Sequence, residues 1–275
     1  MSTQAVASGG ADSVDGSSFD AIVIGAGVAG LYQLYRLREL GLRVRAFEAG
    51  SGVGGTWYWN RYPGARFDSE SWTYGYSFSQ ELLDEWDWQE HFAPQPETER
   101  YLNYVADKFD LRRDIQFDSR VAAARYREES CSWEIALEDG RRYSTRFLIT
   151  AIGILSAPTM PNIPGIDTFK GQACHTHAWP KEGVDFTGKR VGIIGTGATA
   201  VQTIQEIAKT VGARGATVVG RAGLVPLGQC AVLLKPQKAP GELDHPTADP
   251  ALPALASPCS RRLAPLSSGA PVRPA

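Results

Sequence analysis

The chain has 275 residues, of which 43% are hydrophobic and 21% charged, and its formal net charge is −2 at pH 7. This composition is typical of a globular protein with one large or two medium domains, and it excludes a fibrous or wholly disordered chain. The near-neutral charge offers no basic surface for phosphate backbones, so nucleic acid is not an expected partner. The longest apolar run, residues 147–158, is too short to span a bilayer, and no membrane partner is expected.

Residues 1–18 are rich in Ser, Gly, Ala and Asp and lack the apolar centre of a signal peptide, which predicts a disordered lead. The cysteines form neither a CxxC pair nor a His/Cys metal spacing, which favours reduced thiols in a soluble cytoplasmic protein without a metal site. The absent CxxC pair also argues against a flavin disulfide reductase. The four cysteines are Cys131, Cys174, Cys230 and Cys259.

A strand, a helix and a second strand are predicted near the start of the chain. Residues 21–25 are an apolar, β-branched run that ends at glycine, and residues 43–48 read as the second strand. The helix between them is indicated by leucines at helical spacing. These are Leu31, Leu34, Leu37 and Leu40.

The first Gly-rich turn follows the pattern G-x-G-x-x-G of a dinucleotide site. Gly25 permits the tight bend, Gly27 lets a pyrophosphate approach the backbone, and Gly30 allows the helix to pack closely on the strand. Glu48, at the end of the second strand, is placed to accept a hydrogen bond from a ribose hydroxyl and would repel a 2′-phosphate. This site therefore favours FAD or NAD. The alternative is that the glycines are turn residues only and Glu48 is a solvated strand end.

Residues 54–68 combine glycines, aromatic rings and arginines, which suits an isoalloxazine ring. The alternative is an aromatic cluster that fills the core, with Asp68 an ordinary loop carboxylate. Further along, residues 96–109 have helical spacing, and residues 115–149 alternate like antiparallel strands around a turn at 139–140. Residues 147–153 then read as a strand that returns to the first sheet.

A second strand–helix–strand unit is predicted over residues 190–195, 198–211 and 216–219. Its turn is Gly195-Thr-Gly197-Ala-Thr-Ala200, in which alanine at the third position is a permitted variant. Arg221 follows the last strand, and a guanidinium there matches the phosphate of NADPH; the alternative is a surface arginine. Beyond residue 222 the chain is rich in proline and has no periodicity, so we expect an irregular tail.

The segment between the two turns carries a family fingerprint. Its residues match the pattern F-x-G-x-x-x-H-T-x-x-W-P, and the segments 54–68, 74–78 and 101–111 point to the same family. The chain resembles Baeyer–Villiger monooxygenases of the phenylacetone and cyclic ketone branch, from about Phe19 to Val219. A metal site at the two histidines of this segment is not expected, because they lack acidic or cysteine partners. The matched positions are Phe169, Gly171, His175, Thr176, Trp179 and Pro180.

The resemblance implies an α/β flavoprotein that contains FAD and uses NADPH, O2 and a small-molecule ketone. NADPH reduces the flavin, O2 adds at flavin C4a, and the resulting peroxide attacks the ketone to give an ester or lactone. The resemblance also places Thr56 and Trp57 along the flavin and Thr196, Gly197 and Gln202 on NADP. Asp68 corresponds to an acid that orients a catalytic arginine. The full set of implied cofactor-binding residues is Gly25, Gly27, Gly30, Glu48, Gly55, Thr56, Trp57, Asp68, Tyr74, Val121, Thr196, Gly197, Ala198, Gln202 and Arg221.

The expected architecture is two Rossmann-like dinucleotide-binding domains, for FAD and NADP, of which the second is incomplete. In the fingerprint segment, His175 and Trp179 are expected to link domain motion to NADP binding. The predicted boundaries are 1–18 for the lead, 19–157 for the FAD domain, 158–184 for a linker with the fingerprint, 185–221 for the start of the NADP domain and 222–275 for the tail.

The chain departs from the family pattern after Val218, where the family continues Phe-Gln-Arg-Thr-Pro and this chain reads Val-Gly-Arg-Ala-Gly. Family members are nearly twice as long, and the catalytic arginine belongs to the part that has no counterpart here. We therefore expect a truncated or frame-shifted product that is inactive alone. Two alternatives are an N- or S-oxidising flavin-containing monooxygenase and a non-catalytic cofactor-binding fragment. The ketone and the oligomeric state are not predicted.

Overall fold

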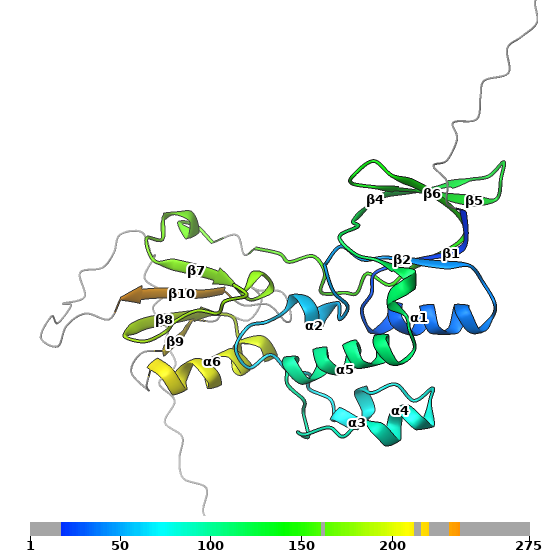
Figure 1. The fold of residues 1–275 in the computed structure, drawn as a ribbon. Coiled ribbons are helices and arrows are strands. Elements are labelled where there is room, and N and C mark those ends of the chain that lie inside the picture. Colours follow the sequence, from blue (N-terminus) through cyan, green and yellow to red (C-terminus); the bar gives the residue numbers. More distant parts are fainter. Residues whose placement is uncertain (1–17, 161–162, 212–215, 220–230, 237–275) are drawn as a thin grey trace, which may run out of the picture. The chain divides into compact units, whose positions relative to one another are not determined.

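The computed structural model describes residues 18–160, 163–211, 216–219 and 231–236, and these residues form two sheets with their helices (Figure 1). In the first sheet the strand order is β3-β2-β1-β6-β5-β4. The first four of these strands run parallel, and β5 and β4 continue the sheet antiparallel. The bounds are β1 (Ser18–Ile24), β2 (Val44–Phe47), β3 (Ile115–Gln116), β4 (Val121–Arg127), β5 (Ser132–Leu137) and β6 (Arg142–Thr150).

Helix α1 (Val28–Glu39) connects β1 to β2 and confirms the predicted first unit. Leu31 and Leu34 are fully buried, because their spacing places them on one face of the helix, over the sheet. Leu40 was expected on the same face, but it is 70% exposed. The helix ends one residue earlier, and Gly41 follows with a φ of +74° that turns the chain away.

Four α-helices lie between β2 and β3 in the sequence, and only the longest was predicted. That helix, α5 (Gln95–Lys108), buries Tyr101, Leu102 and Val105 in the first core. The other three have four to six residues, too few to show a hydrophobic period in the sequence. They are α2 (Thr56–Trp59), α3 (Ser71–Tyr74) and α4 (Gln80–Glu85).

Strand β6 combines two strands that the sequence pattern suggested as separate. It pairs antiparallel with β5 through the turn at Asp139 and Gly140, as predicted, and parallel with β1 along its length. The expected strand over residues 147–153 is therefore the end of β6. Strand β4 forms the edge of this sheet, and most of its residues are exposed.

The second sheet has the order β7-β10-β8-β9 and carries helix α6 (Ala198–Val211), whose predicted bounds are confirmed. Strands β8 and β9 are parallel, and β10 runs antiparallel to both of its neighbours. The bounds are β7 (Gln172–His175), β8 (Lys189–Ile194), β9 (Ala216–Val219) and β10 (Ala231–Pro236).

Two expectations for this region were wrong. Residues 172–175, expected in a linker, form strand β7, and residues 231–236, expected in an irregular tail, form strand β10. The run Ala-Val-Leu-Leu shows no alternation, which is usual for a strand inside a sheet and gives no period to detect. Arg221, the predicted lead before residue 18 and the rest of the predicted tail lie outside the described residues.

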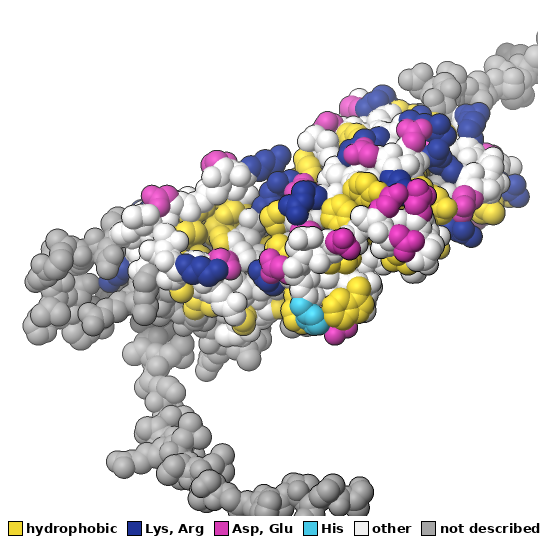
Figure 2. Space-filling view, turned by 60° about the horizontal axis from the view of Figure 1, so that its bottom comes forward, with side chains coloured by type: hydrophobic (Ala, Val, Ile, Leu, Met, Phe, Trp, Pro, Cys, Tyr) yellow, Lys and Arg dark blue, Asp and Glu magenta, His cyan; other side chains and the backbone are white. Residues whose placement is uncertain are grey.

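Charged side chains of both signs are interspersed on the face of the molecule seen in Figure 2, with hydrophobic side chains between them. No helix among the described residues has both the length and the hydropathy needed to cross a membrane.

Candidate functional site

The first Gly-rich turn joins β1 to α1 and leaves bare backbone at the helix N-terminus. A Cβ on Gly25, whose φ is +103°, would stand 2.6 Å from the carbonyl oxygen of Ala151, and a Cβ on Gly30 would overlap the carbonyl oxygen of Gly25. Gly27 is the N-cap of α1, which has neither a capping side chain nor an acidic residue in its first turn. The turn therefore presents unshielded backbone N–H groups, which attract an anion such as a pyrophosphate.

A second glycine segment meets this turn backbone to backbone. A Cβ on Gly27 would lie 3.2 Å from the Cα atom of Gly55, and one on Gly55 would lie 2.8 Å from the Cα atom of Gly27. The amide of Gly54 also donates to the carbonyl of Ala26 at 3.0 Å. The close approach places Thr56, the first residue of α2, beside the turn. The turn fits a dinucleotide through its bare N–H groups, and a side chain at Gly27 or Gly55 would push the two backbone segments apart.

Glu48 follows β2 directly and is 5% exposed. Its Oε2 atom accepts from the Ala26 amide at 2.7 Å, and Oε1 accepts from the Gly50 amide at 2.8 Å. The sequence predicted that this carboxylate receives a ribose hydroxyl. Here it fixes the end of β2 to the first turn, and each oxygen retains a lone pair for a further donor.

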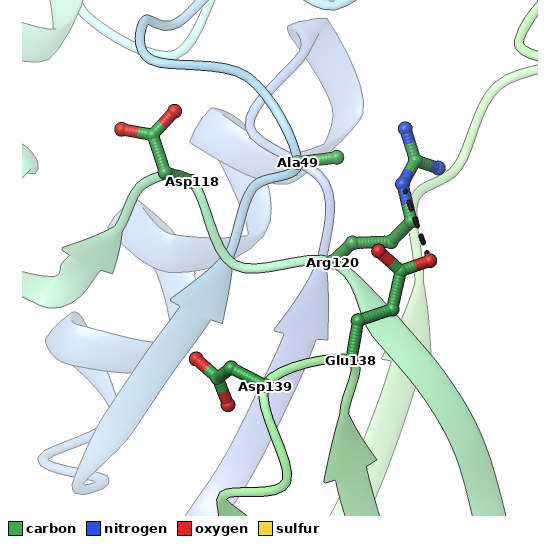
Figure 3. Close-up of a pocket in the computed structure, with 5 residues that line it drawn as sticks. All are labelled: Ala49, Asp118, Arg120, Glu138 and Asp139. Carbon is green, nitrogen blue, oxygen red and sulfur yellow. Dashed lines mark ion pairs between the residues drawn. The ribbon is translucent and has the colours of Figure 1, made fainter.

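A cavity of about 390 Å³ opens beside Glu48, at Ala49. Figure 3 shows its residues, which come from the loops at the ends of neighbouring strands. Arg120 and Glu138, which both line it, form an ion pair at 3.7 Å. Arg120 directly precedes Val121, the first residue of β4. The cavity was not predicted, because loops distant in the sequence form it. The lining residues are Ala49, Asp118, Arg120, Glu138 and Asp139.

Aromatic side chains of the segment 54–68 pack on α3. Trp57 is 6% exposed, and its Nε1 atom donates to the hydroxyl of Tyr74 at 2.7 Å. Phe67 stacks on Tyr74 with a centroid separation of 4.3 Å. Burial raises the pKa of Tyr74, and the Trp57 N–H lowers it in part. The cluster thus brings Trp57 and Tyr74 together, and Asp68, adjacent to Phe67, is exposed at its edge.

The second Gly-rich turn opens α6 in the same way. Thr196 and Ala198 are exposed, and the carbonyl of Gly197 accepts from the amides of Ala200 and Val201 at 3.0 and 3.2 Å. The first turn of α6 contains no acidic residue. The turn therefore has the features of a second anion site at a helix N-terminus.

Gln202, one helical turn further along α6, contacts the loop that precedes Asp68. Its Nε2 atom donates to the carbonyl of Arg66 at 2.9 Å, and its Oε1 atom accepts from the hydroxyl of Tyr62 at 2.9 Å. No role was predicted for Tyr62 or Arg66. Their place in the aromatic and Gly-rich segment was the only available signal, because the partner residue is far away in the sequence.

Three of the six fingerprint residues are buried beside the second sheet, namely His175, Thr176 and Trp179. Trp179 is 6% exposed and packs against Phe186, and Thr176 is 1% exposed. Phe169, Gly171 and Pro180 are partly buried.

His175 is the fingerprint residue with an unusual environment. It is 9% exposed, and its Nδ1 atom accepts from the amide of His177 at 3.2 Å. The neutral ring therefore carries its proton on Nε2, which has no hydrogen-bond partner among the described residues. Burial, and to a lesser degree His177, lowers the pKa of His175. Within the described ranges, no group of three or more His, Cys, Asp or Glu side chains is arranged to hold a metal ion.

Comparison with known proteins identifies related chains. The family model "FMO-like: Flavin-binding monooxygenase-like" matches residues 20–224. An "Acetone monooxygenase (methyl acetate-forming)" of Gordonia sp. (strain TY-5) is 55% identical over 195 residues, which are 71% of this chain and 37% of that protein. "Phenazine N-monooxygenase PhzNO1" of Lysobacter antibioticus is 50% identical over 191 residues, 69% of this chain and 35% of that protein.

Among solved structures, a complex of OTEMO with FAD and NADP is similar, with a TM-score of 0.69 and 51% sequence identity. The similarity covers 74% of this chain and 39% of that one. The chain thus spans little more than a third of the length of the relatives that it matches.

Proposed function

The chain belongs to the flavin-binding monooxygenase-like family, and from this membership we propose that it provides the FAD-binding site and part of the NADP-binding site of a Baeyer–Villiger monooxygenase. The proposed substrates are a small ketone, O2 and NADPH, and the product is an ester or lactone. The observation that carries the proposal is the pair of bare helix N-termini, at Gly27 and Gly197, each at the start of a strand-linked helix.

For FAD, the proposed phosphate contacts are the backbone amides at the start of α1, which no capping side chain occupies. Glu48 would accept from the ribose, and the cavity between Ala49 and Arg120 would admit the adenosine end beside Val121. Thr56, Trp57 and Tyr74 would line the flavin from the side of α2 and α3. Bound FAD would supply the redox chemistry that no side chain of the chain can perform.

For NADPH, the proposed contacts are Thr196, Gly197 and Ala198 at the start of α6.

Asp68 is exposed at the edge of the aromatic cluster, where a carboxylate can orient a cationic partner. His175 and Trp179 belong to the second sheet and would act through its position rather than as acid or base, since both are buried.

The ketone assignment is supported by the relative described as methyl acetate-forming. Conversion of acetone to methyl acetate places one oxygen atom between the carbonyl carbon and a methyl carbon, which is a Baeyer–Villiger oxidation. The same reaction on this chain's own substrate remains the proposal.

The test is an absorbance titration of the purified chain. We expect a bound flavin spectrum after reconstitution with FAD, and loss of its long-wavelength band when NADPH is added without oxygen. Glu48→Gln should weaken FAD binding, and Glu39→Gln, an exposed carboxylate of α1, is the control. A chain that folds but neither retains FAD nor responds to NADPH would contradict the proposal. A chain that binds both without bleaching would favour the cofactor-binding fragment.

A second candidate function is N-oxidation, because this chain and a phenazine N-monooxygenase are 50% identical over 191 residues. The two reactions differ in the nucleophile and not in the cofactors, so the binding experiment does not separate them. If the reconstituted chain turns over, product analysis with cyclic ketones and phenazines in parallel assays separates an ester from an N-oxide.

A further inference from the structure

The loop of residues 61–66 is docked on α6 by several independent contacts. Tyr62 packs against the apolar core of the second sheet. Gly64, with a φ of +78°, approaches so closely that a Cβ there would stand 2.5 Å from the carbonyl oxygen of Gln202 and 2.9 Å from the Cγ atom of Glu206. The loop and the helix therefore meet at backbone distance, which a random surface contact does not require.

Gln202 lies at the centre of this contact and uses both ends of its amide. Its N–H donates to the Arg66 carbonyl, and its carbonyl oxygen accepts from the Tyr62 hydroxyl, each at 2.9 Å. On the opposite side, Arg66 forms a bridge with Pro94, and its guanidinium pairs with Glu90 at 3.1 Å. Arg66 is thus held from two sides, and its carbonyl is fixed by the glutamine.

We propose that Gln202 is a positioning residue, which fixes the loop carrying Asp68 to α6, rather than a ligand of the second dinucleotide. This inference rests on the proposed function. Ala198, at the start of α6, is one helical turn before Gln202, and Arg66 is two residues before Asp68. A nucleotide bound at the N-terminus of α6 would therefore act on the position of Asp68 through Gln202 and the loop that precedes Asp68.

The hydrogen-bond inventory explains why the amide is assigned to the loop. One N–H of the amide and one lone pair of its oxygen already bond to the loop, so a dinucleotide could use only the second N–H or the second lone pair, in the orientation that the loop fixes. Turning the amide toward a ligand would break the bond to the Arg66 carbonyl in a half-buried contact, and such losses are costly.

The first test is limited trypsin digestion of the intact chain, which needs no cofactor. Trypsin cleaves after Arg61 and Arg66, the two arginines of the loop. Gln202→Met removes both hydrogen bonds to the loop, which should raise the population of the open loop and the cleavage rate at these bonds by more than about fivefold. Gln205→Met is the matched control, because Gln205 is exposed on the same helix.

Tyr62→Phe is the second variant, which removes one hydroxyl and keeps the ring in the core. It should accelerate the same cleavages by a smaller factor, so the prediction survives if Gln202→Met fails to fold. Equal cleavage rates in the wild type, Gln202→Met and Gln205→Met would overturn the docking role, as would equal rates in the wild type and Tyr62→Phe if Gln202→Met does not fold.

The second test measures whether Gln202 is needed for bound NADP⁺ to change the absorbance spectrum of the flavin. NADP⁺ added to the FAD-loaded chain should perturb the flavin spectrum in the wild type and in Gln205→Met. Gln202→Met should lose this perturbation while the separate dissociation constants of FAD and NADP⁺ change by less than about twofold. A tenfold weaker NADP⁺ affinity with the full perturbation at saturation would make Gln202 a ligand and overturn the proposal. A wild type that binds neither cofactor would contradict the proposed function, and digestion alone would then decide the docking role.

Discussion

Position 30 must be glycine, because the start of α1 lies against the backbone of the turn at Gly25. A Cβ on Gly30 would overlap the carbonyl oxygen of Gly25 in the preceding turn, so neither neighbour can yield without opening the turn. The sequence motif predicted this residue correctly, because the demand is steric and local. Glu48 was placed at the correct strand end, but its two backbone partners were not foreseen, since they depend on how the turn folds back over β2.

Gly30→Ala should therefore destabilise the chain by more than 2 kcal/mol, roughly the upper range for single substitutions with backbone clashes. The control is Gly41→Ala, where φ is also positive but no atom lies within 4 Å of the added Cβ. That variant should cost only about 1 kcal/mol of backbone strain. Urea unfolding of both variants measures the difference, and equal midpoints would refute the steric explanation.

His175 should make the stability of the second sheet depend on pH. Burial lowers its pKa below the ordinary value of 6.5, so the unfolded chain binds more protons than the folded chain below that pH. The free energy of unfolding should thus be constant above pH 6.5 and fall as the pH drops toward the folded pKa. His177, whose pKa burial also lowers, adds to the same slope.

His175→Asn keeps an acceptor for the His177 amide and removes the titrating ring. Its unfolding free energy should fall less steeply than that of the wild type between pH 7.5 and 5.5, by urea titration at each pH. His91→Gln, at an exposed histidine, is the matched control. Parallel pH profiles for the wild type and His175→Asn would contradict this prediction.

At the scale of elements, the prediction from sequence succeeded where a period was long enough to detect. Helices α5 and α6 have 14 residues each and show their apolar faces in the sequence. The short helices α2, α3 and α4 were missed, because their positions depend on packing against the first core. Strands β7 and β10 were missed for a different reason, since their pairing joins residues far apart in the chain.

Strand β10 is central in the second sheet, so a proline there should disrupt more than the strand itself. Leu233→Pro removes a backbone N–H between β7 and β8, a position where proline is essentially not found. We expect faster amide exchange throughout β7 and β8, with β1 and β6 still protected. Leu233→Ala is the control, because it shortens the side chain and keeps the backbone N–H. If the amides of β7 and β8 exchange as slowly in Leu233→Pro as in the wild type, β10 is dispensable for this sheet.

Over the whole molecule, exposed apolar side chains gather in residues 147–160. Phe147 is 47% exposed, Ile152 59%, Ile154 97% and Met160 58%. Several exposed apolar side chains within one short segment are typical of surfaces that associate. The sequence could not reveal this surface, since exposure follows from which strands cover the sheet.

We expect the purified chain to self-associate at concentrations of about 10 μM and above, in the range typical of exposed apolar surface. Replacing Ile152, Ile154 and Met160 together by serine should shift it toward the monomer in sedimentation experiments. Leu40→Ser is the control, because Leu40 is 70% exposed but lies outside this stretch. A wild-type chain that stays monomeric at these concentrations would refute the prediction.

The order of strands in the second sheet has a consequence for synthesis on the ribosome. Among the described strands, β7 pairs only with β10, whose first residue is 56 positions after the end of β7. The ribosome adds about 5–20 residues per second, so β7 is synthesised several seconds before β10, its partner strand. During that interval the edge of β7 is open to chaperones and to other nascent chains.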